Sequence, residues 1–359
     1  MTLDSRQDCS ASTGMVDVGR PTANGGPTCA KKTQIVSLFS GAGGMDLGFH
    51  QAGFELAVAI DGFSAAIDSY SYNFKSALAH VGDLNEIGPD GVLDLVRKRV
   101  PKGGSIGVIG GPPCQGFSRA NISAETDDPR NSLPKLYLEI VKALQREYVV
   151  EFLVVENVLG IRDKKHAATY AELVSGIDES GFNVNEWVLS ATDFGVAQRR
   201  SRVILVGMNK HRGYAVPRVQ PSQGALTVRD VIGHLAEPVL FSKGVDCSDF
   251  PEHVNHWTMR PKSHRFSQVV RPSSKRRSFK CLDWHKPSPT IAFGNREIHV
   301  HPDGHRRISI YEAMLLQGFP KHFVLKGNLS QQVTQVSNAV PPPLAKGVAE
   351  AICRAMENT

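Results

Sequence analysis

The stretch IVSLFSGAGG, residues 35–44, joins a short apolar run rich in β-branched residues to a glycine-rich turn, and a helix-like segment follows it. In an open α/β sheet, a strand-to-helix turn of this kind lies at the carboxyl edge of the strands, where ligands bind. Glycines let the backbone of such a turn approach a ligand closely. The stretch therefore predicts an α/β domain with a ligand pocket at the end of its first strand.

Further apolar runs repeat this pattern along the chain. They are ELAVAID (55–61), SIGVIG (105–110), EFLVVEN (151–157) and RVILVG (202–207). Helices are expected between them, near 64–74, 91–99 and 165–180, and from Pro134 onward, where Tyr137, Ile140, Val141 and Leu144 recur at helical spacing. We interpret all the runs as strands of a parallel sheet, which predicts a doubly wound, mostly parallel α/β fold.

Composition divides the chain into four parts. Residues 1–33 are polar and lack an apolar period, which predicts a disordered tail, whereas 34–210 carry the alternating strands and helices. Residues 211–289 break this rhythm with prolines and six of the thirteen histidines, which indicates a small, irregular inserted domain. Residues 290–359 end in a helical segment that we expect to pack back on the first domain.

The positive charge of the chain is local. Residues 211–289 contain thirteen Lys and Arg against six Asp and Glu, an excess of seven, whereas the whole chain carries a net charge of only +6. Lys275, Arg276 and Arg277 form its densest cluster. Such a region can neutralise a nucleic-acid backbone, although a solvated basic face has the same composition.

Several classes of protein are disfavoured by the sequence. No run of about eighteen apolar residues could span a bilayer, and no secretory signal is evident at the first residues, so we expect a cytoplasmic protein. The six cysteines are scattered singly, which favours reduced thiols. Cys247, His253, His256 and Cys281 all lie in the insertion, but their spacing matches no recognised ligand pattern, and we predict no metal site.

Acidic residues at strand ends favour a nucleoside ligand beside the glycine turn. Asp61 ends the second predicted strand, where its carboxylate can accept bonds from ribose hydroxyls, and Asp83 follows another strand. The dinucleotide fingerprint fails, because Asp46 stands where its third glycine belongs. Each Asp alone is more often a helix cap, but the convergence of several strand ends on one edge favours a pocket.

The segment GGPPCQGFS, residues 110–118, presents Cys114 on a loop stiffened by two prolines directly after a strand. A nucleophilic cysteine needs such access, whereas a structural cysteine is normally embedded in apolar sequence. Glu156 closes the next strand and should project into the same cleft. Within Gln198–Arg202, alternate residues share a face, so Arg200 and Arg202 can direct two guanidinium groups at a base carbonyl, a phosphate or the carboxylate.

These segments resemble, in order and spacing, the motif series of the cytosine-C5 DNA methyltransferase family. The matching stretches are FSGAGGMDLGF (39–49), GDL (82–84), GGPPCQGFS (110–118), ENV (156–158), QRRSR (198–202), RRISIYEAMLLQGFP (306–320) and QVSNAVPPPLA (335–345). The resemblance covers residues 35–356 except the basic insertion. It implies the S-adenosylmethionine-dependent methyltransferase fold, with a target-recognition domain at 211–289.

The resemblance also implies roles for individual residues. Cys114 would be the nucleophile, Glu156 would bond the base N3 and exocyclic amine, Arg202 would bond the base O2, and Arg200 would organise the cleft. The residues expected to hold S-adenosylmethionine are Phe39, Gly41, Gly43, Asp61, Asp83, Asn338 and Val340. The residues expected to contact DNA are Gln115, Ser118, Lys275, Arg276 and Arg277. Asp61, Gly62 and Ser337 depart from the family's usual Glu, large side chain and Gly.

The expected reaction is methyl transfer to C5 of a flipped-out cytosine in a short duplex sequence of about four to six base pairs, through a covalent Cys114–C6 adduct. We expect a monomer that acts beside a restriction endonuclease with the same target. Two alternatives share most of the motifs: a tRNA cytosine methyltransferase and a catalytically inactive DNA-binding member of the family. A nicotinamide-dependent oxidoreductase is a more distant alternative.

Overall fold

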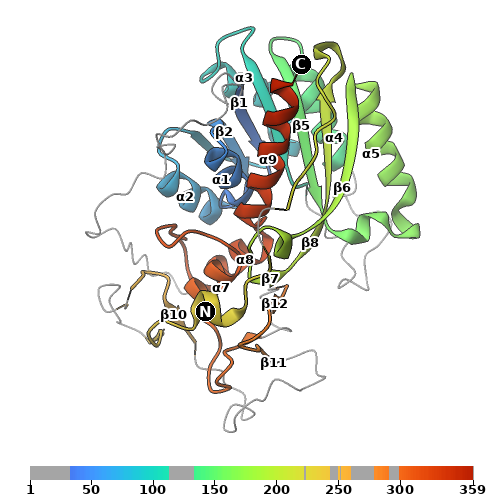
Figure 1. The fold of residues 1–359 in the computed structure, drawn as a ribbon. Helices are drawn as coiled ribbons and strands as arrows, with labels where there is room; N and C mark the ends of the chain where they lie inside the picture. Colours follow the sequence, from blue (N-terminus) through green and yellow to red (C-terminus); the bar gives the residue numbers. More distant parts are fainter. Residues whose placement is uncertain are drawn as a thin grey trace.

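The computed structural model describes residues 33–112, 133–221, 224–242, 250, 252–259, 279–290 and 299–358. Figure 1 shows a large upper lobe built on one sheet and a smaller lower lobe that contains the short strands. The predicted tail, apart from Thr33, lies outside the described residues. So do Cys114, Gln115 and Ser118, and so do the basic residues 275–277.

The large lobe holds a seven-stranded sheet in the order β3-β2-β1-β4-β5-β8-β6. Its strands are β1 (Thr33–Leu38), β2 (Glu55–Asp61), β3 (Leu78–Val81), β4 (Ser105–Gly110), β5 (Val149–Asn157), β6 (Phe182–Ser190) and β8 (Ser201–Asn209). The pairings from β3 to β5 are all parallel. The predicted doubly wound, mostly parallel fold is confirmed.

One strand runs against the predicted direction. Residues 202–207 were expected in a parallel strand, but β8 is antiparallel to both β5 and β6. The reversal follows from the short connection after β6, which contains only one 3₁₀ turn (Ala191–Asp193) and the two-residue strand β7 (Gln198–Arg199). A connection without a crossover helix returns the chain beside the strand that it has just left, and such neighbours are antiparallel.

Helices cover both faces of the sheet (Figure 1). They are α1 (Gly44–Gln51), α2 (Ser64–Asn73), α3 (Leu84–Arg97), α4 (Leu133–Leu144), α5 (Ala167–Glu179) and α9 (Pro342–Glu357). Two apolar cores result, one beneath α1 and α9 and one beneath α3, α4 and α5. Among the described helices, none is long and apolar enough to cross a membrane.

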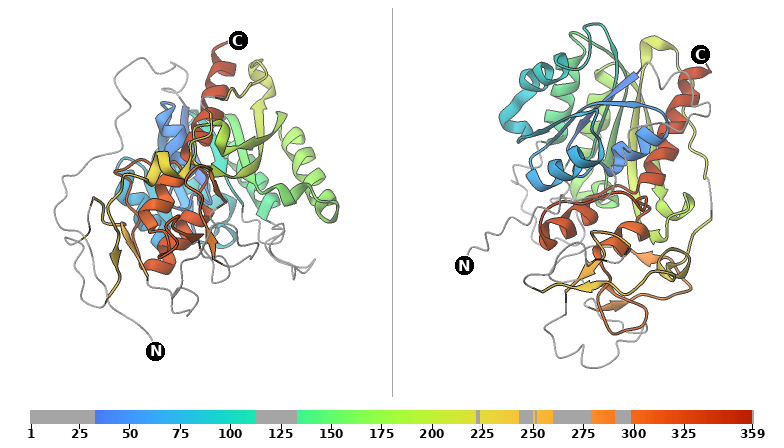
Figure 2. Two further views of the ribbon diagram at one scale, coloured as in Figure 1. Left: turned by 60° about the horizontal axis from the view of Figure 1, so that its bottom comes forward. Right: turned by 90° about the vertical axis from the view of Figure 1, so that its left-hand side faces the viewer.

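The lower lobe combines the insertion with the segment that follows it (Figure 2). Its elements are α6 (Val228–Ile232), β9 (Val239–Leu240), β10 (Trp257–Thr258), β11 (Lys280–Cys281), β12 (Ser288–Pro289), β13 (His299–Val300), α7 (Ile310–Leu316) and α8 (Leu329–Asn338). β11 pairs with β13, so residues on both sides of the expected boundary at 289 meet here. β12 pairs with β7 and thereby joins the lower lobe to the large one.

Gly48 allows the C-terminal helix, α9, to pack closely against the first helix, α1. An added Cβ at Gly48 would lie 2.5 Å from the backbone nitrogen of Lys346 and 2.6 Å from the carbonyl oxygen of Pro342. Backbone atoms cannot move aside as a side chain can, so α1 and α9 can approach this closely only at a glycine. This contact returns the end of the chain to the first strand-to-helix unit.

The variant Gly48→Ala is expected to lower the free energy of unfolding by about 1–3 kcal/mol, because the added methyl group forces α1 and α9 apart. Thermal unfolding followed by circular dichroism measures the change. Gly224→Ala is the matched control, since no atom lies within 4 Å of a Cβ placed there. Equal midpoints for the wild type and Gly48→Ala would contradict the packing argument.

Candidate functional site

The glycine turn after β1 has a left-handed backbone at several positions. The φ angles of Phe39, Gly41 and Gly43 are 55°, 55° and 89°. At Gly43 an added Cβ would lie 2.5 Å from the Phe74 ring and 2.9 Å from the Tyr70 ring, whereas at Gly41 no atom lies within 4 Å of it. The turn therefore packs against α2 on one side and leaves free space at Gly41.

Asp61, at the end of β2, fixes this turn. Its carboxylate accepts bonds from the backbone N–H groups of Gly41 and Phe63, each at 2.8 Å. Burial raises the pKa of the Asp61 carboxyl, and the two backbone bonds oppose that shift. Next to it, a Cβ on Gly62 would meet only the Gly82 carbonyl oxygen, at 3.9 Å. Open directions at Gly41 and Gly62 thus flank one half-buried carboxylate.

Asp83 lies at the neighbouring strand end, where it caps α3. Its Oδ1 accepts bonds from the backbone N–H and the side-chain amide of Asn85, both at 2.9 Å. The side chain is exposed. Gly82 donates a backbone bond to the Asp61 carbonyl oxygen, so the ends of β2 and β3 are joined directly.

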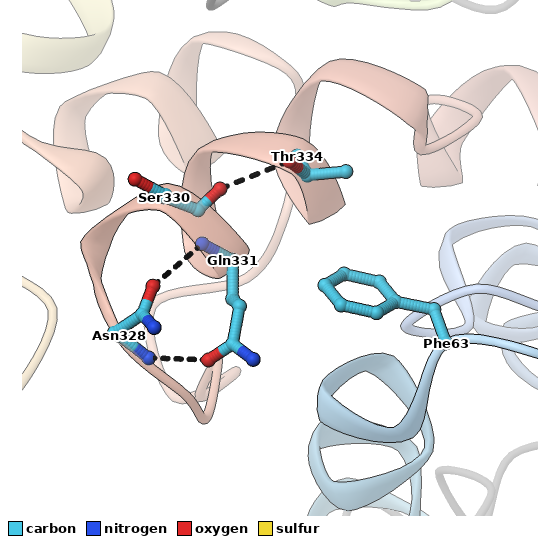
Figure 3. A pocket seen from close by; sticks show the side chains of 5 residues that line it. All are labelled: Phe63, Asn328, Ser330, Gln331 and Thr334. Atoms are coloured by element: carbon cyan, nitrogen blue, oxygen red, sulfur yellow. Dashed lines mark hydrogen bonds between the residues drawn. The ribbon is translucent and has the colours of Figure 1, made fainter. Parts of the chain in front are cut away.

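A cavity of about 350 Å³ opens between the start of α2 and the start of α8 (Figure 3). Its lining residues are Phe63, Asn328, Ser330, Gln331 and Thr334. The Phe63 ring faces the first turns of α8, where Asn328 and Gln331 bond one another in a capping box. Phe63 directly follows Gly62 in the chain, so a large aromatic ring lies next to the open position at Gly62.

The segment from Ser337 to Val340 is held from three sides. Arg200, which is 2% exposed, donates from Nη2 to the Ser337 carbonyl oxygen at 3.0 Å. The buried side-chain amide of Gln317 donates to the Ala339 carbonyl oxygen. From the third side, a Cβ on Gly44 would lie 2.5 Å from the Val340 carbonyl oxygen, so α1 begins directly against this segment.

Glu156 and Arg202 form an ion pair at the carboxyl edge of the sheet. Arg202 Nε lies 2.6 Å from Glu156 Oε1, and the two side chains are only 11% and 12% exposed. A Cβ on Gly111 would lie 3.1 Å from Glu156 Oε2, so the chain leaves β4 directly over the carboxylate. Cys114 lies three residues further on, within about 11 Å of Gly111 even for a fully extended backbone.

The structure therefore brings most of the described candidate site residues to the carboxyl edge of the seven-stranded sheet. The glycine turn, Asp61, Asp83, Asn338 and Val340 lie at or beside the ends of β1, β2 and β3, and Glu156 and Arg202 lie at the ends of β5 and β8. Arg200 and Arg202 have different partners. Arg200 binds the Ser337 carbonyl oxygen, and Arg202 binds the Glu156 carboxylate. Asn338 is exposed, whereas Val340 is 7% exposed.

Sequence reasoning missed a buried pair beneath the glycine turn. Asp46 in α1 is fully buried, and its Oδ1 accepts a bond of 2.9 Å from the Tyr70 hydroxyl. Burial raises the pKa of Asp46 to about 6, against the bonds from Ser37 and Tyr70. In the sequence, Asp46 stands out only because it replaces the third glycine of the dinucleotide fingerprint. No sequence signal joins it to Tyr70, which lies 24 residues away.

The histidines and cysteine considered for a metal site have other contacts. His256 bonds Ser309 Oγ through Nδ1 at 2.9 Å and the Ala236 carbonyl oxygen through Nε2 at 2.8 Å. The His253 ring stacks on Tyr311 with centroids 4.3 Å apart, and burial lowers its pKa to about 4. Cys281 is buried, and Cys247 lies outside the described residues.

The variant Asp46→Asn is expected to remove part of the pH dependence of stability. The raised pKa of Asp46 means that the folded chain favours the protonated carboxyl, so its contribution to the unfolding free energy is full below about pH 4 and declines as the pH rises through about 6. Urea unfolding across this range measures the effect, with the exposed Asp68→Asn as control. If Asp46→Asn and the wild type lose stability equally over this range, the buried carboxyl is not the cause.

Comparison with known proteins identifies the family. A family model described as C-5 cytosine-specific DNA methylase matches residues 33–354. The Type II methyltransferase M1.HphI of Haemophilus parahaemolyticus is 34% identical over 357 residues, which cover 92% of this chain and 89% of that protein. M.MthTI of Methanothermobacter thermautotrophicus, also a Type II methyltransferase, is 32% identical over 345 residues, which cover 90% and 98% of the two chains.

Solved structures share the fold. A protein of E. coli, described as a DNA modification methyltransferase encoded within a prophage, superposes with a TM-score of 0.73 at 22% identity, over 90% of this chain and 99% of that one. DNMT2 of Spodoptera frugiperda superposes with a TM-score of 0.62 at 16% identity, over 89% and 99%. The resemblance predicted from the motifs is confirmed: the chain belongs to the C-5 cytosine-specific DNA methylase family.

Proposed function

We propose that this chain transfers a methyl group from S-adenosylmethionine to C5 of a cytosine in duplex DNA, with Cys114 as the nucleophile. The observation that carries this proposal is the Glu156–Arg202 ion pair, which lies directly beneath the strand end that leads to Cys114. A largely buried, ion-paired carboxylate supplies the acid–base partner that cytosine activation needs, and Cys114 follows Gly111 by three residues.

The carboxyl edge at β1 and β2 fits S-adenosylmethionine. Asp61 offers a half-buried carboxylate for ribose hydroxyls, and the open directions at Gly41 and Gly62 leave space for a ligand against the backbone. Phe63 supplies an apolar wall to the cavity beside it, whose other lining residues are polar. Asp83, Asn338 and Val340 complete the proposed set with Phe39 and Gly43. When bound, S-adenosylmethionine supplies the electrophilic methyl group that C5 receives.

The residues of the chain activate the base. C5 of cytosine is a poor nucleophile, and the target must first be flipped out of the stacked duplex at a cost of a few kcal/mol. Addition of the Cys114 thiolate at C6 forms a C–S bond and makes C5 electron-rich, while Glu156 stabilises the proton at N3. Arg202 orients the Glu156 carboxylate and contacts the base O2. Loss of the C5 proton and elimination of Cys114 then break the C–S bond and restore the free enzyme.

Arg200 is proposed to position the backbone of the site and not to contact the base. Its guanidinium group is buried and bonds the Ser337 carbonyl oxygen, so it is a positioning residue that fixes the backbone next to Asn338. The same segment packs against the start of α1 at Gly44. Arg200 thereby links the strand that carries Arg202 to the proposed methyl-donor site.

The lower lobe provides the proposed DNA-binding surface. Residues 211–289 carry the net positive charge of the chain, and phosphate neutralisation by such a region drives much of DNA binding. Gln115 and Ser118 would contact the target from the loop of Cys114. The similarity to Type II methyltransferases favours a short specific target shared with a restriction endonuclease.

Substitution of Cys114 by alanine is expected to abolish methylation. Bisulfite sequencing of plasmid DNA from cells that express the wild type should show a fixed protected cytosine context, and Cys114→Ala should show none.

Glu156→Gln, which keeps the size of the side chain, should reduce the rate of methyl transfer by about 10²–10³-fold, because the proton at N3 loses its charged partner. Cys353→Ala, which removes a buried thiol in α9, is the control.

Absence of protection by a wild-type chain that is folded and binds S-adenosylmethionine would exclude the DNA reaction in these cells. Methylation of tRNA in the same cells would then identify an RNA substrate. Full protection by Cys114→Ala would exclude the covalent step.

Alanine at all three basic residues 275–277 is expected to weaken binding to duplex DNA and to reduce the slope of log affinity against log salt by about 2–3, since each lost phosphate contact releases about one counterion fewer. Fluorescence anisotropy with a labelled duplex measures both quantities. The control replaces the exposed Lys98, Lys102 and Lys142 of the upper lobe by alanine. Equal slopes for the triple variant and the wild type would show that residues 275–277 make no phosphate contacts.

A further inference from the structure

Arg307 lies at the junction of the short strands in the lower lobe. It forms an antiparallel bridge with Val300 of β13, and its carbonyl oxygen accepts a bond of 3.2 Å from Arg306 Nη1. Thr258 Oγ1 of β10 lies 3.5 Å from the same carbonyl oxygen. The backbone of Arg307 is therefore fixed by two neighbouring segments, and its side chain is half-buried.

The guanidinium group of Arg307 is unpaired within the described residues. Within the part of the chain that the structure describes, its side chain makes no hydrogen bond and lies within ion-pair distance of no carboxylate. Burial lowers the pKa of Arg307, and no carboxylate opposes that shift. Arg306 is the opposite case, because it bonds both oxygens of the buried Glu312 at 2.8 Å and also contacts Glu237.

Lys280 brings a second positive charge to the same junction. It lies in β11, where it pairs with His299 of β13 in the strand register. Burial and the positive charges of Lys280 and Arg307 together lower the pKa of His299 to about 4, so this histidine is neutral at pH 7. The described Glu312 and Glu237 are engaged by Arg306.

Partial burial of an unpaired guanidinium group raises the free energy of the folded state, because its lost hydration is not replaced by a hydrogen bond or an opposite charge. A ligand that lowers this cost must carry a negative charge as well as acceptor oxygens. A DNA phosphodiester has both, and its oxygens match the planar fork of arginine. A base edge offers acceptors without net charge, so it would leave the charge of Arg307 uncompensated.

We infer that Arg307 binds a backbone phosphate of the DNA substrate, with Lys280 as a supporting charge. This inference rests on the proposed function of the lower lobe in DNA binding. The contact fixes the lobe on the duplex and reads no base directly, as phosphate contacts do in general. Arg307 thereby adds a contact from the end of the chain to those proposed for residues 275–277.

The test is Arg307→Met in the full-length chain, since methionine retains much of the aliphatic stem and removes the charge. The probe is a fluorescein-labelled duplex of random sequence, titrated at several salt concentrations. Affinity at low salt is expected to fall about tenfold, with a reduction of about 1 in the salt slope. The thermal midpoint is expected to be unchanged or higher, because the variant loses an unpaired half-buried charge.

Two controls separate binding from folding. Lys98→Met removes an exposed charge at the opposite edge of the sheet and should leave affinity and slope unchanged. Arg306→Met should lower the thermal midpoint, because it leaves the buried Glu312 without its partner. A structural role for Arg307 would give the Arg306 result, a lower midpoint, and would overturn the inference.

The inference and the proposed function fail in different ways. If the wild type binds and methylates DNA while Arg307→Met has the same affinity and salt slope, the phosphate contact is excluded and the proposed function stands. A loss confined to one duplex sequence, with an unchanged slope, would identify a base contact and exclude the phosphate. If the wild type binds no duplex at all, the proposed function itself is wrong.

Discussion

The antiparallel pairing of β8 with β5 places Arg202 beside Glu156, and the rest of the site depends on this constraint. Because β8 runs against its neighbour, its first residues lie at the carboxyl edge of the sheet, where β4 and β5 end. In a parallel strand of the same nine residues, Arg202 would lie about 20 Å away, near the opposite edge. A single reversal of chain direction therefore brings the Arg202 guanidinium group to the Glu156 carboxylate, beside the end of β4 at Gly111.

The segment from Ser337 to Val340 joins the two halves of the site. Arg200 reaches it from the residue just before β8, Gln317 reaches it from the end of α7, and α1 packs on it at Gly44. A displacement of this segment would alter the proposed methyl-donor site and the position of Arg200 together. The close contact of α1 with α9 at Gly48 holds the helix that follows the segment, so the C-terminal helix is fixed against the first helix.

Burial gives charged groups of the same type different roles. Arg306 and Arg307 are adjacent, yet the first is neutralised by Glu312 within the protein and the second is left without a partner in the described lobe. Asp46 and Asp61 both have raised pKa values, but Asp46 is enclosed against Tyr70 whereas Asp61 borders open space at Gly62. A charge whose surroundings supply no compensation is the one that can be assigned to a ligand.

The sequence by itself determined the fold class, the order of the motifs and the family, because short apolar runs and glycine turns are governed by local backbone preferences. It also located Glu156 and Asp61 at strand ends. The tertiary structure alone decided the direction of β8, the attachment of Arg200 to Ser337, the Asp46–Tyr70 pair and the isolation of Arg307. These features depend on which distant segments pair and on which groups share a buried volume, and no local pattern encodes either.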